Sequence, residues 1–100
     1  MSDGVCISVD VFRPSSAGSF PAIIGVHAYD QAMQSAPSIP KAITFPNAQA
    51  EAGDPNFFVR RGYVHLIVNA RGTGQSEGVY AHYCPREVDD IVEVIAWVAK

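Results

Sequence analysis

Alternating hydrophobic and polar positions predict a strand near the start of the chain, over residues 5–12. The apolar residues of "VCISVDVF" occupy every second position: Val5, Ile7, Val9 and Val11. A two-residue period is typical of a strand with one buried and one exposed face. We therefore expect an antiparallel strand near the edge of a sheet. The Pro-, Ser- and Gly-rich residues 13–21 that follow predict a turn.

Two short, continuous apolar runs predict strands that are buried on both faces. They are "AIIGVHA" at residues 22–28 and "VHLIVN" at residues 64–69. Such runs are typical of strands in a parallel sheet, and the second is rich in β-branched residues. Between them, residues 30–56 carry four prolines and no sustained period, which indicates irregular chain with at most one or two helical turns. Residues 57–63 then predict a short helix that Gly62 ends.

A longer helix is predicted from about Pro85 onward, because proline is well tolerated in a first helical turn. Acidic residues follow, near the positive end of the helix dipole. Large apolar residues then recur at helical spacing: Val88, Ile91, Val92, Ile95 and Val98. We expect this stripe to pack inward, with Asp89, Asp90 and Glu93 facing away from it.

The order strand, loop, strand, helix is the beginning of a doubly wound α/β architecture. A crossover helix leads to a further parallel strand, and residues 1–100 contain none after the last helix. We therefore expect these residues to be the front part of one larger domain.

Composition narrows the class of partner. The 100 residues are 48% hydrophobic, which suits one globular domain. A net charge of −3 with 17% charged residues provides no basic stripe for nucleic acid and no polybasic patch for anionic lipid. The N-terminus lacks the pattern of a signal peptide, and no apolar stretch approaches the roughly 18 residues that span a membrane. We expect a cytoplasmic protein that binds neither nucleic acid nor membrane.

The two cysteines, Cys6 and Cys84, are isolated in the sequence. There is no C-x-x-C pair and no histidine at ligand spacing, so neither a zinc site nor a disulfide framework is indicated. The glycines of residues 71–78 do not form a phosphate-binding pattern either, because Glu77 stands where the last glycine would be needed. We expect no metal and no cofactor.

The stretch "RGTGQSEG", residues 71–78, contains the G-x-S-x-G pattern of a serine-hydrolase nucleophile elbow. In such an elbow the serine stands on a tight turn that joins a strand directly to a helix. Ser76 instead lies seven residues beyond Asn69, and the helix begins only near residue 85. We therefore interpret Ser76 as part of a structural turn whose ends Arg71 and Glu77 hold together.

The stretch "GVHAYDQ", residues 25–31, lies at the carboxyl end of a predicted buried strand. Ligands bind at this end of the strands in open α/β sheets. His27 lies inside the apolar run, which favours a packed or hydrogen-bonded histidine. Tyr29 is either a half-buried core aromatic or a donor to a developing oxyanion, and the residues alone leave both open. Asp30 is most simply a turn or cap residue.

Four blocks of the sequence resemble, in order and along the whole chain, one family of α/β-hydrolases. The blocks are "SDGVCISVDVFRP", "PAIIGVHAYDQ", "EAGDPNFFVRRGYVHLIVNARGTGQSEG" and "PREVDDIVEVIAWVAK". The family is that of the Xaa-Pro dipeptidyl-peptidases and cocaine esterase, also called CocE/NonD. The resemblance implies an α/β-hydrolase fold, with a mostly parallel sheet and an antiparallel first strand. Residues 1–100 would be the N-terminal part of its single catalytic domain, incomplete as it stands.

The resemblance also implies a function. The full protein would be a serine hydrolase that cleaves ester or amide and peptide bonds through an acyl-enzyme, with a small-molecule ester or peptide as substrate. Tyr29 matches the tyrosine that donates its hydroxyl to the oxyanion. The Ser-His-Asp triad would lie beyond Lys100, in the remaining C-terminal part of the same protein, so these 100 residues alone should be inactive. The alternative from another class is a non-catalytic, flavodoxin-like α/β module that binds a small ligand or a partner.

Overall fold

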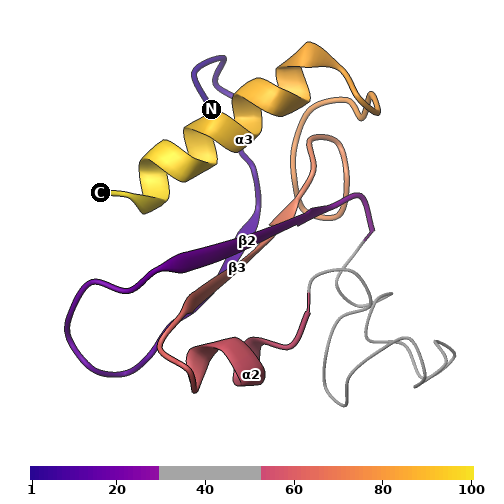
Figure 1. Ribbon diagram of the computed structural model, residues 1–100. Coiled ribbons are helices and arrows are strands. Elements are labelled where there is room, and N and C mark those ends of the chain that lie inside the picture. Colours follow the sequence, from indigo (N-terminus) through magenta and orange to yellow (C-terminus); the bar gives the residue numbers. More distant parts are fainter. Residues whose placement is uncertain (30–52) are drawn as a thin grey trace, which may run out of the picture.

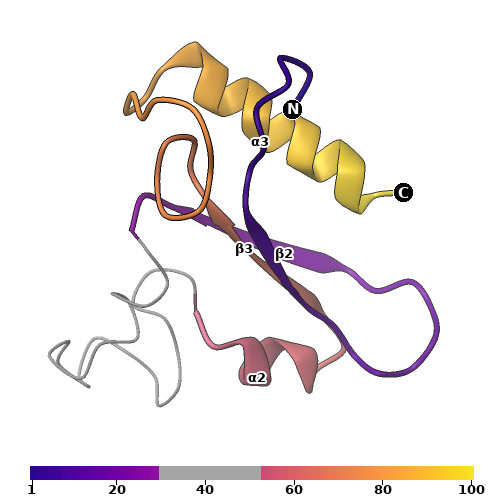
Figure 2. The ribbon, with the colours of Figure 1, turned by 180° about the vertical axis from the view of Figure 1, so that it is seen from behind.

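Within the described part of the chain, three strands form a mixed sheet with one helix on each side (Figure 1). The computed structural model describes residues 1–29 and 53–100. The view from behind shows the same layers, with α3 above the sheet and α2 below it (Figure 2). The elements are β1 (Val9–Phe12), β2 (Ala22–His27), α2 (Pro55–Val59), β3 (Val64–Asn69) and α3 (Pro85–Val98).

The strand order is β1-β3-β2, so β3 is the central strand. β1 pairs with it antiparallel, with Val9 opposite Val68, and β2 pairs with it parallel, with His27 opposite Asn69. The predicted antiparallel edge strand and parallel strand pair are therefore confirmed. β1 begins at Val9 rather than at residue 5, because the backbone before Val9 pairs with residues 71–78, the glycine-rich loop. In this pairing Glu77 N donates to Cys6 O over 2.9 Å.

The core lies along β3, where Leu66, Ile67 and Val68 are at most 3% exposed. This strand has the predicted bounds and the predicted burial on both faces. β2 also forms where it was predicted, but the expectation that it is buried on both faces is wrong. It is an edge strand of the described sheet, and Val26 is 36% exposed.

The short helix α2 begins and ends earlier than predicted. It begins at Pro55 because the Asp54 carboxylate accepts a hydrogen bond from Asn56 N, which caps the first turn. The helix ends at Val59, and the turn after it reaches the left-handed conformation at Gly62, at φ +84°. Phe58 packs its ring 5.1 Å from that of His65 in β3, which fixes α2 against the sheet. The irregular segment expected at residues 30–56 lies largely outside the described residues.

Helix α3 begins at Pro85 as predicted, but the face that it turns to the sheet agrees with the prediction only in part: of the predicted stripe, Ile91 and Val98 are half-buried. Val94 and Asp90 are the buried residues of the helix, at 2% and 5% exposure. Val88 and Val92, expected to pack inward, are 61% and 58% exposed. The hydrophobic pattern misidentified the face because the inward stripe includes a carboxylate, and that carboxylate is buried with an arginine described below.

No helix within residues 1–29 and 53–100 combines the length and the apolarity needed to cross a membrane.

Candidate active site

The carboxyl ends of the parallel strands β2 and β3 meet at one edge of the sheet. Their last residues, His27 and Asn69, are register partners. The backbone continues the pairing one step further, because Ala70 N donates to His27 O over 2.8 Å. Residues that follow either strand are thereby held at the same edge, the one at which open α/β sheets bind their ligands.

Tyr29 lies two residues beyond the end of β2, at this edge. Its side chain is 53% exposed, so it is not a core aromatic within the described part of the chain. His27 is only 5% exposed, in agreement with its interpretation as a packed histidine. Of the two groups, Tyr29 is the one that a ligand at this edge can reach. Asp30 lies outside the described residues.

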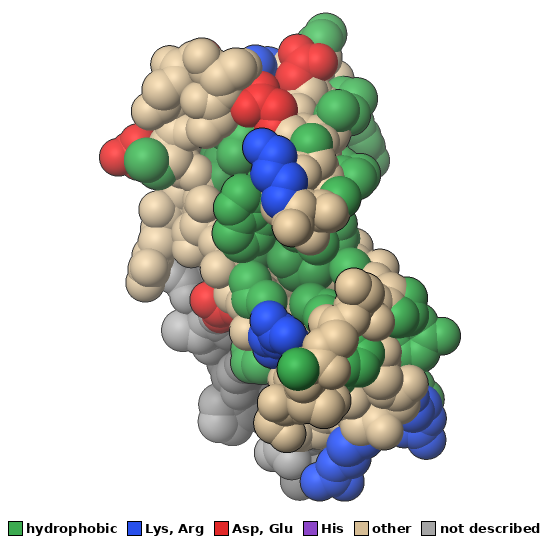
Figure 3. Space-filling view, turned by 90° about the vertical axis from the view of Figure 1, so that its left-hand side faces the viewer, with side chains coloured by type: hydrophobic (Ala, Val, Ile, Leu, Met, Phe, Trp, Pro, Cys, Tyr) green, Lys and Arg blue, Asp and Glu red, His purple; other side chains and the backbone are tan. Residues whose placement is uncertain are grey.

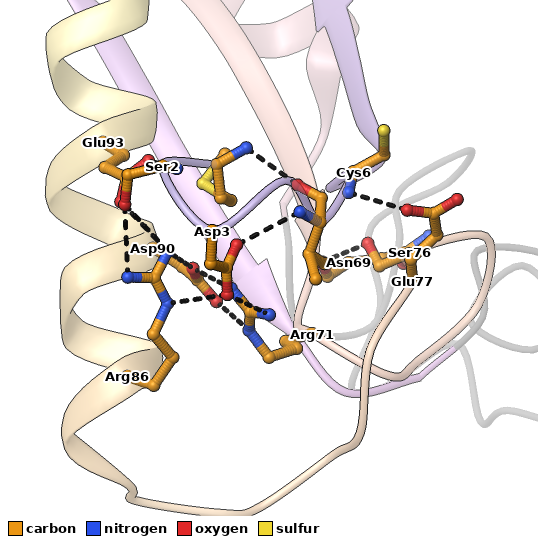
Figure 4. Close-up of polar contacts among 12 residues, drawn as sticks. Ser2, Asp3, Cys6, Asn69, Arg71, Ser76, Glu77, Arg86, Asp90 and Glu93 are labelled. Atoms are coloured by element: carbon orange, nitrogen blue, oxygen red, sulfur yellow. Dashed lines mark hydrogen bonds and ion pairs between the residues drawn. The ribbon is translucent and has the colours of Figure 1, made fainter.

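Ser76 is a buried residue of the glycine-rich loop, and its hydroxyl binds backbone groups of two separate segments (Figure 4). Ser76 Oγ donates to Asn69 O over 2.7 Å and accepts from Ser8 N over 2.9 Å. The hydroxyl thus joins the end of β3 to the chain that leads into β1. This geometry agrees with a structural serine, because the oxygen that a nucleophile would present to a substrate is occupied by backbone groups.

The expectation that Arg71 and Glu77 hold the ends of the loop together is met by the backbone and not by their side chains: Gly72 N donates to Glu77 O over 2.9 Å, while the two side chains bind elsewhere. Glu77 accepts from Cys6 N over 2.9 Å, so it binds the N-terminal segment. Arg71 forms a two-point contact with Asp90 of α3, through Nε at 2.7 Å and Nη2 at 2.6 Å. The reason is spatial: α3 lies over the loop and offers the arginine a buried carboxylate, whose position no local sequence pattern reveals.

A network of ion pairs extends from Arg71 across α3 (Figure 4). Asp3 lies 2.9 Å from Arg71 and 3.4 Å from Arg86, and Arg86 lies 3.0 Å from Glu93. Ser2 completes the network, because both its backbone N–H and its hydroxyl donate to Glu93. The network therefore joins the N-terminal segment, the glycine-rich loop and α3 into one unit.

The network shifts the pKa values of its members. The hydrogen bonds that Ser2 donates lower the pKa of Glu93 below its ordinary value of 4.5, with a smaller contribution from Arg86. A hydrogen bond from Val5 N and the nearby arginines lower the pKa of Asp3 below 3.8. The hydrogen bonds with Asp90, and then with Asp3, raise the pKa of Arg71. All three shifts favour the charged forms.

A second polar group lies in residues 79–84, between the glycine-rich loop and α3. The Tyr80 hydroxyl lies 2.8 Å from His82 Nδ1, and the His82 ring packs 3.7 Å from that of Tyr83. Burial is the main cause that raises the pKa of Tyr80 above 10.0, followed by the charge of Glu87.

Within the two described ranges, no cluster of three or more His, Cys, Asp or Glu side chains is arranged to hold a metal ion. Cys6 is exposed and Cys84 is half-buried, and both are free thiols.

The sequence pattern marked neither the buried position of Asp90 nor the Tyr80–His82 pair. Asp90 was expected on the solvent face of α3, and its pairing with Arg71 depends on residues 19 positions apart. The Tyr80–His82 pair had no motif to mark it. Its only signal in the sequence is the unusual density of aromatic residues in "VYAHYC".

Comparison with known proteins relates this geometry to a family. Residues 3–100 match the sequence model of the family described as "X-Pro dipeptidyl-peptidase (S15 family)". The chain is 29% identical over 102 residues to the cocaine esterase of Rhodococcus sp. (strain MB1 Bresler). This alignment covers 100% of the chain and 15% of the esterase.

Solved structures give the same result. Two crystal structures of a CocE/NonD family hydrolase from Staphylococcus aureus superpose with TM-scores of 0.79 and 0.80, at 31% and 32% identity. Each covers 97% of this chain and 18% of the solved one, so the chain spans less than a fifth of the relatives that it matches. The described fold is a small α/β unit with a mixed three-stranded sheet, similar to the N-terminal region of such a hydrolase. With its sequence matched over residues 3–100, the chain belongs to the X-Pro dipeptidyl-peptidase (S15) family of hydrolases.

Proposed function

We propose that residues 1–100 form the N-terminal part of a single α/β-hydrolase catalytic domain, within a longer serine hydrolase. The family membership and the structural likeness to a CocE/NonD hydrolase support this proposal over a flavodoxin-like binding module. The substrate is a small molecule with an ester, amide or peptide bond. The proposed location remains the cytoplasm.

In the proposed reaction a serine hydroxyl attacks the substrate carbonyl, and the alcohol or amine leaves as the acyl-enzyme forms. Water then attacks the acyl carbonyl and releases the acid, which restores the serine. The serine, histidine and aspartate that carry out these steps belong to chain beyond residue 100, the part that corresponds to most of each relative's length. Ser76 has no role in the chemistry.

Residues 1–100 contribute Tyr29 to this site. Its hydroxyl donates a hydrogen bond to the oxyanion that forms when the carbonyl is attacked. The observation that carries this role is the position of Tyr29 at the shared carboxyl end of β2 and β3, with a side chain that is 53% exposed. A donor held on a strand end needs little rearrangement as charge develops, which is how such groups stabilise a transition state.

The test is Tyr29→Phe in the full-length enzyme, which removes the hydroxyl and keeps the ring. We expect kcat for an ester substrate to fall by roughly 100-fold or more, as is typical for the loss of one oxyanion donor. Tyr63→Phe is a matched control, because Tyr63 is also partly exposed but precedes β3 and so lies at the opposite end of the sheet. An unchanged kcat in Tyr29→Phe would refute the role.

A further inference from the structure

The ion pair between Arg71 and Asp90 lies against the edge of the sheet that carries Tyr29. The Arg71 guanidinium binds the Asp90 carboxylate through Nε at 2.7 Å and through Nη2 at 2.6 Å (Figure 4). A small cavity of about 10 Å³ is lined by these two residues together with Val26 and Ala70, at the carboxyl ends of β2 and β3. The pair is therefore packed between α3 and the ends of the two parallel strands.

The backbone connects Arg71 to the end of β2. Arg71 directly follows Ala70, whose N–H donates to His27 O over 2.8 Å. Thr73 fixes Ala70 from the other side, because its N–H and its hydroxyl donate to Ala70 O over 3.0 and 2.6 Å. Residues 70–73 thus form one closed turn, with Arg71 inside it. Tyr29 follows His27 by two residues, so the position of this turn determines the position of the strand end from which Tyr29 extends.

The glycine-rich loop leaves room for the arginine to reach α3. A Cβ atom at Gly78 would lie 2.8 Å from Arg71 Cγ and 3.3 Å from its Nη1, and Gly78 has a φ of +88°, which favours glycine. The two charged side chains are only 11% and 8% exposed. A two-point contact between a guanidinium and a carboxylate fixes the relative orientation of both groups. The ion pair therefore sets where the turn lies relative to α3.

We propose that Arg71 and Asp90 are positioning residues, whose ion pair clamps the turn after β3 to α3 and thereby holds the strand end that carries Tyr29. The inference rests on the proposed role of Tyr29 as oxyanion donor. Neither charged side chain touches the substrate in this scheme. A donor that is already in place stabilises the transition state without reorganisation, and a misplacement of about 1 Å can cost roughly 100-fold in rate.

The first test measures kcat and KM in the full-length enzyme. Arg71→Lys keeps the positive charge but loses the two-point contact, so kcat should fall by roughly tenfold while KM is unchanged. Asp90→Asn should have the same effect, because the amide does not replace the carboxylate as a two-point acceptor. In a Tyr29→Phe background neither substitution should lower kcat further, because the donor that they position is absent.

Glu93→Gln is the matched control within the same network of charges. Glu93 binds Arg86 and Ser2 rather than the turn after β3, so this variant should keep the kcat of the wild type. Three results would overturn the inference: an unchanged kcat in Arg71→Lys, a loss of the same size in Glu93→Gln, or a loss that is equally large when the Tyr29 hydroxyl is absent.

A second readout does not depend on catalysis. Because the Ala70 N–H is bonded to His27 O, peptides of the full-length protein that contain Ala70 should exchange amide hydrogen faster in Arg71→Lys, as measured by mass spectrometry. In Glu93→Gln the exchange should match the wild type. If Tyr29→Phe leaves kcat unchanged, the proposed function fails, and the exchange at Ala70 still decides whether the ion pair holds the strand end. Equal exchange at Ala70 in Arg71→Lys and in the wild type would exclude the positioning role.

Discussion

At the scale of single residues, Ser76 shows how a motif can match letter for letter and serve a different purpose. Its hydroxyl satisfies one backbone acceptor and one backbone donor on two separate segments, and the side chain is only 9% exposed. Leaving buried backbone groups without partners is costly. The serine is therefore a structural link between the glycine-rich loop, β3 and the chain before β1.

Ser76→Ala should destabilise the protein without a direct effect on catalysis. Losing the hydroxyl leaves Ser8 N and Asn69 O without this partner, which should cost about 1–3 kcal/mol and lower the thermal midpoint of the full-length protein. Ser15→Ala, at an exposed position of the turn between β1 and β2, should leave the midpoint unchanged. Covalent labelling of Ser76 by a fluorophosphonate probe would contradict the structural role.

The place of Tyr29 in the fold could be predicted from the sequence and that of Tyr80 could not, for a physical reason. Tyr29 follows a predicted strand, and the carboxyl ends of parallel strands are where α/β sheets bind ligands, so its position along the chain predicts the edge at which it lies, while its role there is a proposal. Tyr80 lies in an irregular segment 11 residues beyond the end of β3. Its place depends on the close approach of the Gly72 backbone and on the hydrogen bond that Tyr83 N donates to the Glu87 carboxylate, and both contacts exist only in the folded chain.

At the scale of elements, the strands were predictable because burial and hydrophobicity coincide in them. β3 has the predicted bounds, and β2 is one residue shorter than expected. In α3 the two properties separate, because Asp90 is buried and Val88 is exposed. The inward position of Asp90 becomes favourable because Arg71 supplies two hydrogen bonds and Arg86 adds an ion pair at 3.1 Å. A hydrophobic pattern does not include such partners.

The same network predicts how acid affects the N-terminal segment. Asp3 and Glu93 have lowered pKa values in the folded protein, so they contribute stability above their ordinary values of 3.8 and 4.5. That contribution is lost as the pH falls through the lowered values. We expect the backbone of residues 1–8 to lose hydrogen-exchange protection below about pH 4, measured by mass spectrometry with rates corrected for intrinsic pH dependence.

Asp3→Asn tests whether the ion pairs cause this loss. The variant should reduce the protection of residues 1–8 already at neutral pH, because the amide no longer attracts Arg71 and Arg86. Asp89→Asn is the matched control on the exposed side of α3, and it should behave like the wild type. Equal protection of residues 1–8 in Asp3→Asn and in the wild type would show that the network does not hold the segment.

At the scale of the whole molecule, hydrophobic side chains are exposed both in a groove beside the end of α3 and on the outer face of this helix. Figure 3 shows hydrophobic side chains gathered in the hollow between the end of α3 and the loop that joins β1 to β2. The structure has a groove of about 450 Å³ there, whose lining includes Phe20, Leu66 and Trp97. On the outer side of the helix, Val88, Val92 and Ile95 are each more than half exposed. Surface of this kind usually contacts other protein.

This surface predicts the behaviour of residues 1–100 when they are produced alone. With Val92 and Ile95 open to water, the isolated polypeptide should bind the dye ANS and self-associate, as measured by fluorescence and by sedimentation velocity. In the proposed longer protein we expect neighbouring chain to cover the helix, because the relatives matched are more than five times the length of this segment. The double variant Val92→Lys/Ile95→Lys should therefore reduce self-association of residues 1–100 but destabilise the full-length protein.

Val79→Lys, which replaces a valine that is 81% exposed in a loop, separates the effect of added charge from the effect of the helix face. If residues 1–100 are monomeric and do not bind ANS, or if Val79→Lys is as effective as the helix variant, then the exposed face of α3 is not the cause.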